Sequence, residues 1–167
     1  MPVYLFTHHG FGTWLPDHRR GYTQKNQGYQ PTSQPLAKSY RSVMKHEVFY
    51  FTRGTQQRLI ERLQAIAETE DYRLHGVATD RTHLHAVVSW RNEHLTFRKV
   101  RGRIKNLLAL DLSRAAGITG RPWFSREASR KQVSDEEHFN YLLRVYLPKH
   151  QGWQWYEDRG WVDPGST

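Results

Sequence analysis

The sequence predicts an α+β domain built on a ferredoxin-like split βαβ antiparallel sheet. Short runs rich in β-branched and aromatic residues indicate strands, and longer runs with apolar residues at helical spacing indicate helices. Their order along the chain is strand, helix, hairpin, helix and strand. We expect helices on one face of the sheet and a further helix near the C-terminus. The 167 residues suffice for a core, so residues 1–167 are assigned to a single domain.

The first predicted element is a short apolar strand over residues 2–7, Pro-Val-Tyr-Leu-Phe-Thr. It leads into a glycine-punctuated loop, residues 8–16, and then into a polar segment. Few apolar positions recur there, so we expect an irregular polar insertion at about 17–45. Long ordered loops are usually functional. Residues 48–52, Val-Phe-Tyr-Phe-Thr, fit either a strand or the end of a helix.

A helix and a β-hairpin are predicted next. Residues 55–69 carry their apolar side chains on one helical face, and Thr55 is the expected N-cap. Residues 72–79 and 83–89 are predicted strands. The three residues between them form a turn short enough to make the two strands a hairpin.

Two more helices follow the hairpin. The first is expected over residues 96–115 and is ended by glycines and a proline, after which Trp123 and Phe124 open a short strand. The last helix starts near Asp135, whose carboxylate can cap it. Its predicted apolar face consists of Phe139, Leu142, Leu143 and Tyr146.

Composition favours a nucleic-acid partner. The chain has 25 Lys and Arg against 16 Asp and Glu, a net charge of +9, with six Trp, nine Tyr and seven Phe. Cations meet phosphates and aromatic rings stack on bases in nucleic-acid complexes. The chain has no cysteine, which excludes a disulfide framework and a thiolate metal site. Without an apolar run of about 18 residues or a signal-peptide pattern, we expect a cytoplasmic protein with no membrane partner.

The most informative motif is His83-Leu84-His85, in the second strand of the predicted hairpin. Residues i and i+2 of a strand point to the same face, so the two imidazoles lie side by side, about 7 Å apart at their Cα atoms, with Leu84 buried behind them. Neutral imidazole is the commonest side-chain metal ligand, and this pair can hold one divalent ion on a rigid platform. The ordinary alternative is a half-buried strand that happens to show two histidines.

Four motifs give the chain a resemblance to the Y1-type HUH transposases of the IS200-like and REP-associated tyrosine transposase group. The name HUH describes His, a hydrophobic residue and His. The motifs occur in the family's order over nearly the whole chain. They are residues 12–16 with 20–22, residues 83–85, residues 123–127 with 131–138, and residues 146–150 followed by Gly152 and Trp153.

The resemblance implies a metal-dependent single-stranded DNA transesterase. Such enzymes cleave and rejoin DNA at hairpin-flanked sites through a covalent 5′-phosphotyrosine, with Mg²⁺ or Mn²⁺ as the divalent metal. The matching motif implies Tyr146 as the nucleophile. Tyr141 lies on the same predicted helix and is the alternative, although it points off the apolar face that Tyr146 continues.

In this family a polar residue four positions after the tyrosine often completes the metal site. That position is His150 here, which would join His83 and His85 because residues i and i+4 adjoin on a helix. Pro148 departs from the pattern, since proline removes a helical hydrogen-bond donor and kinks or ends the helix. Gln151 is therefore kept as the fallback ligand.

Basic residues in two segments are the candidate DNA contacts. The insertion offers Arg19, Arg20 and Lys25, which can grip a DNA hairpin. The helix over residues 96–115 offers either phosphate-neutralising side chains, with binding that weakens steeply in salt, or a solvated amphipathic face. Its basic residues are Arg98, Lys99, Arg101, Arg103 and Lys105. The expected partner is single-stranded DNA containing a hairpin, bound by a monomer or a homodimer.

A second function class is a non-catalytic basic nucleic-acid-binding module on the same sheet, as in RNA-recognition domains. That alternative predicts aromatic residues facing out of the central strands, where His83 and His85 stand instead. A related replication initiator or relaxase is a third possibility, but such proteins usually carry extra domains that 167 residues cannot hold. His8 and His9 are expected at the surface or in contact with DNA, and an approach to the metal is the alternative because they adjoin the loop over residues 10–16. His75 is expected to be structural or solvated.

Overall fold

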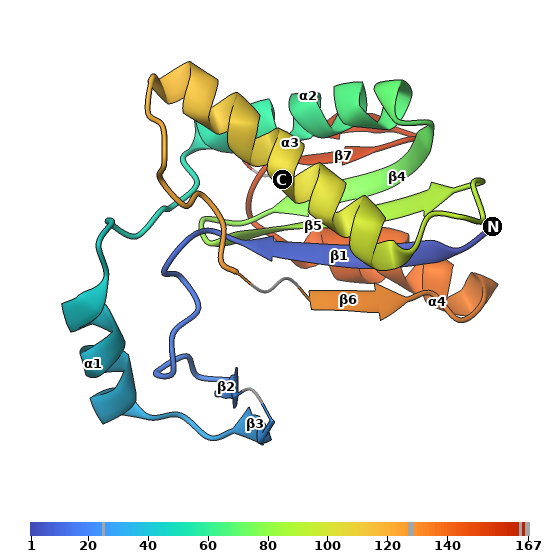
Figure 1. The fold of residues 1–167 in the computed structure, drawn as a ribbon. Helices are drawn as coiled ribbons and strands as arrows, with labels where there is room; N and C mark the ends of the chain where they lie inside the picture. The colour runs from blue at the N-terminus through green and yellow to red at the C-terminus, as the bar shows by residue number, and fades with distance from the viewer. Residues whose placement is uncertain (25, 127–128, 164, 166–167) are drawn as a thin grey trace.

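A computed structural model describes residues 1–24, 26–126, 129–163 and 165, and it confirms the α+β class. Within that part of the chain, six strands form an antiparallel sheet with the order β6-β1-β5-β4-β7-β8 (Figure 1). The predicted hairpin forms the two central strands of the sheet, β4 and β5. The strands are β1 (Val3–His9), β4 (Tyr72–Thr79), β5 (His83–Trp90), β6 (Ser129–Gln132), β7 (Gln154–Tyr156) and β8 (Gly160–Val162).

Two long helices, α2 (Arg53–Thr69) and α3 (Phe97–Ala116), cover one face of the sheet (Figure 1). Their apolar side chains form the main core with alternate residues of the central strands, such as Leu84 and Val88, which are almost completely buried. Burying such a side chain contributes about 1.5–3 kcal/mol relative to leaving it in water. This core therefore fixes which face of β5 points away from the helices.

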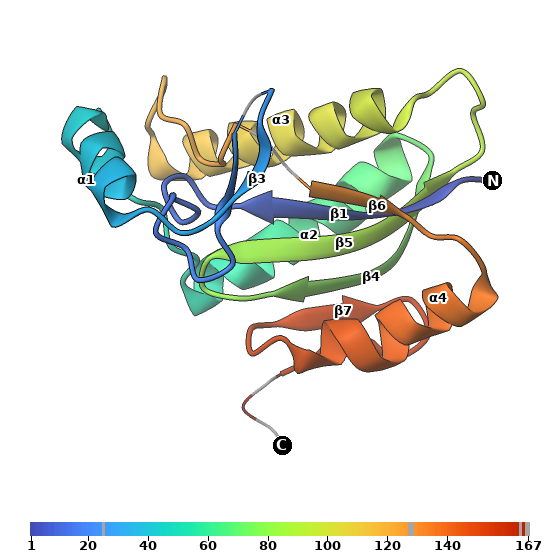
Figure 2. The same ribbon diagram turned by 90° about the horizontal axis from the view of Figure 1, so that it is seen from below.

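The C-terminal helix lies on the other face of the sheet (Figure 2). Leu142 and Leu147 from this segment pack against Leu5 of β1 and Val87 of β5. The expected helices on one face are α2 and α3, and the further helix expected near the C-terminus lies on the opposite face. Because the central strands are apolar on both sides, both faces of the sheet need a cover.

The C-terminal helix changes its winding along its length. α4 (Glu136–Tyr141) begins after Asp135, whose carboxylate accepts the backbone N–H of His138, as predicted. The chain continues as a π-helical turn, η1 (Leu142–Tyr146), and a 3₁₀ turn, η2 (Leu147–Lys149). Pro148 lies in the 3₁₀ turn, where the helix ends, because proline has no N–H with which to continue it.

Several expected boundaries differ from the structure. β1 runs on to His9, so His8 and His9, expected in the loop over residues 8–16, belong to the strand. α2 begins at Arg53 and its N-cap is Thr52, whose hydroxyl accepts the backbone N–H of Thr55. Thr55, the expected cap, therefore lies inside the first turn, and residues 48–52 form neither a strand nor the end of a helix. The strand expected at Trp123 and Phe124 is reduced to a single bridge between Phe124 and Gly10.

The segment at about 17–45 holds regular structure as well as loops. β2 (Tyr22–Gln24) and β3 (Gly28–Gln30) form a small hairpin, and α1 (Gln34–Val43) follows it with Ser33 as N-cap. These elements project from the sheet beside the start of β5 (Figure 1). Among the described residues, no helix is long and apolar enough to cross a membrane.

Candidate active site

β5 presents His83 and His85 on the face of the sheet that the C-terminal segment covers. Leu84 between them is fully buried on the opposite face, as the period of a strand predicts. Antiparallel pairing with β1 places His9 opposite His83 and Thr7 opposite His85. Because β5 is hydrogen-bonded to a strand on each side, both imidazoles stand on a rigid base.

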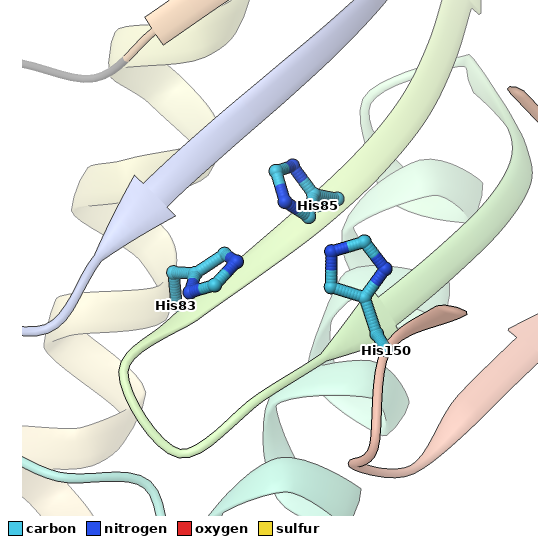
Figure 3. Close-up of side chains that lie close together, drawn as sticks. All are labelled: His83, His85 and His150. Atoms are coloured by element: carbon cyan, nitrogen blue, oxygen red, sulfur yellow. The ribbon is translucent and has the colours of Figure 1, made fainter. Parts of the chain in front are cut away.

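A third imidazole, that of His150, joins the pair from the chain just after η2 (Figure 3). The ring centroids of His85 and His150 are 4.5 Å apart, and those of His83 and His150 are 5.6 Å apart. One ring nitrogen from each of the three residues lies within 4.8 Å of the other two. Although the helix ends at Pro148, His150 stays close to His83 and His85. The backbone of His150 is extended, and its ring lies beside those of β5 (Figure 3).

In each of the three rings, Nδ1 already has a hydrogen-bond partner. Nδ1 of His85 lies 2.7 Å from the Thr7 hydroxyl, and Nδ1 of His83 lies 2.9 Å from the Thr82 hydroxyl. His150 Nδ1 lies 3.0 Å from the carbonyl oxygen of Leu147.

These contacts decide which nitrogen faces the centre. A carbonyl only accepts, so neutral His150 donates from Nδ1 and keeps its lone pair on Nε2. Hydroxyl oxygens can accept in the same way from His83 and His85. Metal-binding histidines usually engage their other nitrogen like this, so the donor set fits a divalent ion.

Burial keeps the imidazoles of His83 and His85 in their metal-binding form. Loss of solvent, with the charges of neighbouring histidines adding, lowers the pKa of His85 to about 2. The same loss of solvent lowers the pKa of His83 to about 4, against the opposing effect of the Asp80 carboxylate. Both rings are therefore neutral near pH 7, and a neutral imidazole has a lone pair for a metal.

Asp80, in the turn before His83, adds a carboxylate that the sequence reasoning missed. Its Oδ2 lies 3.7 Å from Nε2 of His83 and 4.0 Å from Nε2 of His150. Its Oδ1 accepts the backbone N–H of Gln151. Gln151, the fallback ligand, has an exposed side chain beside a different hollow, next to Arg53. His150, rather than Gln151, thus lies beside the histidine pair.

Tyr146 is the tyrosine that the structure brings to the imidazoles. Its hydroxyl oxygen lies 3.3 Å from Nε2 of His85, and its ring contacts both His85 and His150 edge to face. Burial raises the pKa of Tyr146, and the positive charge of Arg20 works against that rise. Tyr141 is 46% exposed and lines a shallow surface hollow on the outer side of α4.

His83, His85 and His150, together called the imidazole group below, line a cleft with Tyr146. Its volume is about 510 Å³, within the usual range for ligand sites. Two predicted DNA contacts, Arg19 and Arg20, lie on its wall. His9, for which an approach to the metal was the alternative expectation, also lines the cleft. Further lining residues that sequence reasoning did not place here are Trp14, His18 and Lys149. The register between β1 and β5 accounts for the place of His9, because it pairs with His83. A larger cavity of about 790 Å³, around Phe139 and His75, contains none of the grouped histidines.

The basic residues of α3 lie behind the sheet, on the face away from the cleft. Arg103 pairs with Glu70 at 2.9 Å, and Lys105 donates to the carbonyls of Ser125 and Arg126. Arg98 and Lys99 are exposed, and Arg101 is partly exposed. The structure does not bring these five residues to the imidazoles. Lys25 lies outside the described residues.

Two further histidines have other surroundings. His8, expected at the surface, is buried between β1 and α3, because its side chain alternates to the core face. His75 is buried on the cleft side of the sheet, where it contacts the Ser89 hydroxyl at 2.8 Å and the Glu157 carboxylate at 3.2 Å. His75 is thus a structural residue, one of the two roles expected for it.

No family model and no curated protein sequence matches the chain. A solved structure of a REP-associated tyrosine transposase bound to a REP hairpin is similar to it, with a TM-score of 0.47 and 11% sequence identity. The likeness covers 88% of this chain and 62% of that chain, so this chain spans less than two thirds of the length of the protein it matches.

Proposed function

We propose that the chain is a metal-dependent single-stranded DNA transesterase, a tyrosine transposase or nuclease. The observation that carries the proposal is the phenolic oxygen of Tyr146, 3.3 Å from Nε2 of His85 in a group of three imidazoles. Those imidazoles have their Nδ1 atoms engaged, so Nε2 is the nitrogen that would bind a metal, and the Tyr146 hydroxyl lies beside that nitrogen of His85. A nucleophile beside metal ligands is what transesterification at a phosphate needs.

When bound, a divalent ion supplies Lewis-acid neutralisation of the phosphate charge that otherwise repels a nucleophile. His83, His85 and His150 would hold it. The hydroxyl of Tyr146 forms the new bond to phosphorus, the bond from phosphorus to the 3′ oxygen breaks, and the phenolic proton lost is balanced by the proton that the 3′ oxygen gains. The product is a 5′-phosphotyrosine and a free 3′-OH, and the ester retains the energy for rejoining.

The ligand set bears on the choice of metal. Mg²⁺ prefers oxygen ligands in octahedral geometry, whereas imidazole suits softer ions. With three imidazoles and one nearby carboxylate, Mn²⁺ should support cleavage at least as well as Mg²⁺. Zn²⁺ should bind to the same group without supporting turnover.

The proposed substrate is single-stranded DNA that contains a hairpin. Arg19 and Arg20 reach the cleft from the insertion, where they can neutralise phosphates beside Tyr146. The family resemblance adds the hairpin next to the cleavage site. Equal affinity for hairpin and unstructured strands would count against this part of the proposal.

The test is covalent capture of DNA. The protein is incubated with Mn²⁺ and a library of single-stranded oligonucleotides that carry imperfect hairpins, and protein–DNA adducts are separated under denaturing conditions. We expect adducts with the wild type and none with His83→Ala or His85→Ala. His94→Ala is the matched control, because His94 is exposed in the loop after β5. Cleavage at the wild-type rate in EDTA would overturn the proposal, and binding without adducts would favour the non-catalytic module.

A further inference from the structure

A series of rings leads out of the imidazole group toward the insertion. The ring of His9 lies 5.3 Å from that of His83, and Trp14 lies 4.6 Å from His9, measured between centroids. The ring of His18 then stacks on Trp14 at 3.8 Å with only 16° between the planes. The chemistry proposed for Tyr146 uses neither Trp14 nor His18, although both line its cleft.

Hydrogen bonds hold the loop that carries these two rings in place. The Thr13 hydroxyl donates to the carbonyls of Gly10 and Thr82, which ties the loop to the turn that precedes His83. The backbone N–H of Arg20 donates to Nδ1 of His18 at 3.2 Å, which orients the His18 ring. The two rings are therefore preorganised on the cleft wall, without help from a ligand.

Two arginines lie beside the rings of Trp14 and His18. Arg19 and Arg20 follow His18 directly, are exposed, and line the same cleft as Tyr146. The charge of Arg20 acts on Tyr146, whose pKa it lowers against the effect of burial. An anionic group that lies between Arg20 and Tyr146 would thus meet the cation and the proposed nucleophile together.

We propose that Trp14 and His18, with Arg19 and Arg20 beside them, form a subsite for an unpaired nucleotide next to the reacting phosphate. The rings would take the base by stacking, and the guanidinium groups would take the flanking phosphates. That this phosphate is the scissile one rests on the function proposed above, whereas the binding of an unpaired base does not. A duplex keeps its bases inside the stack, so this subsite selects single strands.

The competing explanation is that the stack only holds the loop in shape. The two explanations differ in what they predict for DNA without bases. A stacking subsite prefers a strand with bases over an abasic strand with the same phosphates. A merely structural stack gives no such preference, and its loss would affect both strands alike.

The experiment measures binding, in EDTA so that no cleavage occurs. The probes are an oligodeoxythymidylate about 12 nucleotides long and an abasic strand of equal length, within the site sizes known for single-strand binders. We expect Trp14→Ala to weaken binding of the thymidylate strand by about 5- to 150-fold, the range for loss of one stacked base, and to leave binding of the abasic strand unchanged. Trp14→Phe should recover most of the loss, and His18→Ala should resemble Trp14→Ala.

Arg20→Ala should behave differently, because it removes a phosphate contact. It should weaken binding of both strands and reduce the dependence of log affinity on log salt by about one. The matched controls are Trp161→Ala, an aromatic residue 41% exposed on β8, and Arg91→Ala, an exposed residue beyond the far end of β5. Both should leave the two affinities unchanged.

Equal loss of affinity for both strands in Trp14→Ala, or no loss for either, would overturn the subsite. A cooperative urea transition and unchanged Mn²⁺ binding in Trp14→Ala establish that the loop and the imidazole group are intact in that comparison. Failure of the proposed function is distinguishable, because it would remove covalent adducts from the wild type while the base preference remained.

Discussion

The hydroxyl oxygen of Tyr146 lies 3.3 Å from Nε2 of His85. The two residues are 61 positions apart in the chain, and the contact joins η1, which carries Tyr146, to β5, which carries His85. The contact joins the proposed nucleophile to a proposed metal ligand. A phosphate bound at the imidazoles would therefore lie within reach of one phenol and not of Tyr141, which is exposed on the outer side of α4.

Replacing Tyr146 with Phe should abolish the covalent adduct with DNA. The substitution removes one oxygen and little packing, so the variant should fold and bind single strands as the wild type does. Mass spectrometry of the trapped adduct identifies the modified residue. Tyr141→Phe is the matched control and should retain nearly all adduct formation. A nucleotide found on Tyr141 would keep the mechanism and overturn the assignment of the nucleophile.

Replacing Thr7 with Val should weaken metal binding although Thr7 is not itself a ligand. Its hydroxyl, 2.7 Å from Nδ1 of His85, is buried and fixes which nitrogen of that ring faces the cleft. Removal of such a partner commonly costs about 10- to 100-fold in metal affinity. Titration calorimetry with Mn²⁺ measures the change. Thr119→Val, at an exposed position after α3, serves as control, and equal affinities in the two variants would contradict the role of Thr7.

The sequence predicted the elements that depend on local pattern. Alternation along β5 placed His83 and His85 on one face and Leu84 on the other, and this needs only the period of a strand. The strands of the central hairpin and the cap at Asp135 follow from turn length and side-chain chemistry in the same way.

What the sequence could not supply depends on tertiary packing. The basic residues of α3 have two possible roles, DNA contact or a solvated face, and the sequence could not show that they lie on the face of the sheet away from the cleft. The periodicity of a helix shows which of its sides is buried but does not show which face of the sheet it covers. The pairing of His9 with His83 requires the register between β1 and β5. The place of His150 depends on how the chain leaves the helix at Pro148, and the contacts that decide this come from residues far away in the sequence, such as Asp80.

Replacing Gly152 with Ala should disturb the turn that carries His150. A Cβ atom there would lie 2.3 Å from the carbonyl oxygen of Thr79, and the backbone N–H of Gly152 donates to that same oxygen. Forcing an atom into such a space typically costs about 1–3 kcal/mol. We expect a lower free energy of unfolding in urea together with weaker Mn²⁺ binding, because the turn must move to make room.

The matched control for Gly152→Ala is Gly102→Ala. Gly102 lies within α3, and no described atom outside its own helix turn lies within 4 Å of the position of a Cβ. Alanine there should stabilise the protein by about 0.5–1 kcal/mol, because it restricts the unfolded chain and favours the helix. Metal affinity should stay the same. If Gly152→Ala also leaves the metal affinity unchanged, the turn at Gly152 does not determine the position of His150.

Replacing His8 with Leu should stabilise the protein, most strongly in acid. His8 is 1% exposed, and neither of its ring nitrogens has a hydrogen-bond partner among the described residues. Burial, with the charges of Lys105 and Arg101 adding, lowers its pKa to about 3. A buried polar group without a partner costs about 1–3 kcal/mol, so a gain of about 1 kcal/mol is expected near pH 7.

The pH dependence of His8 has a definite sign. In the unfolded chain the pKa of histidine is about 6.5, so as the pH falls from about 6.5 toward 3 the unfolded state binds a proton that the folded state does not. The free energy of unfolding therefore falls, by up to about 1.4 kcal/mol per pH unit for this one group. His8→Leu removes that term, so its stability should decline less steeply than that of the wild type between about pH 6 and pH 4. Urea denaturation in EDTA across this range measures both slopes, with His94→Leu as the exposed control. Parallel curves for His8→Leu and the wild type would mean that His8 finds a proton acceptor or water in solution, and that its burial does not govern its charge.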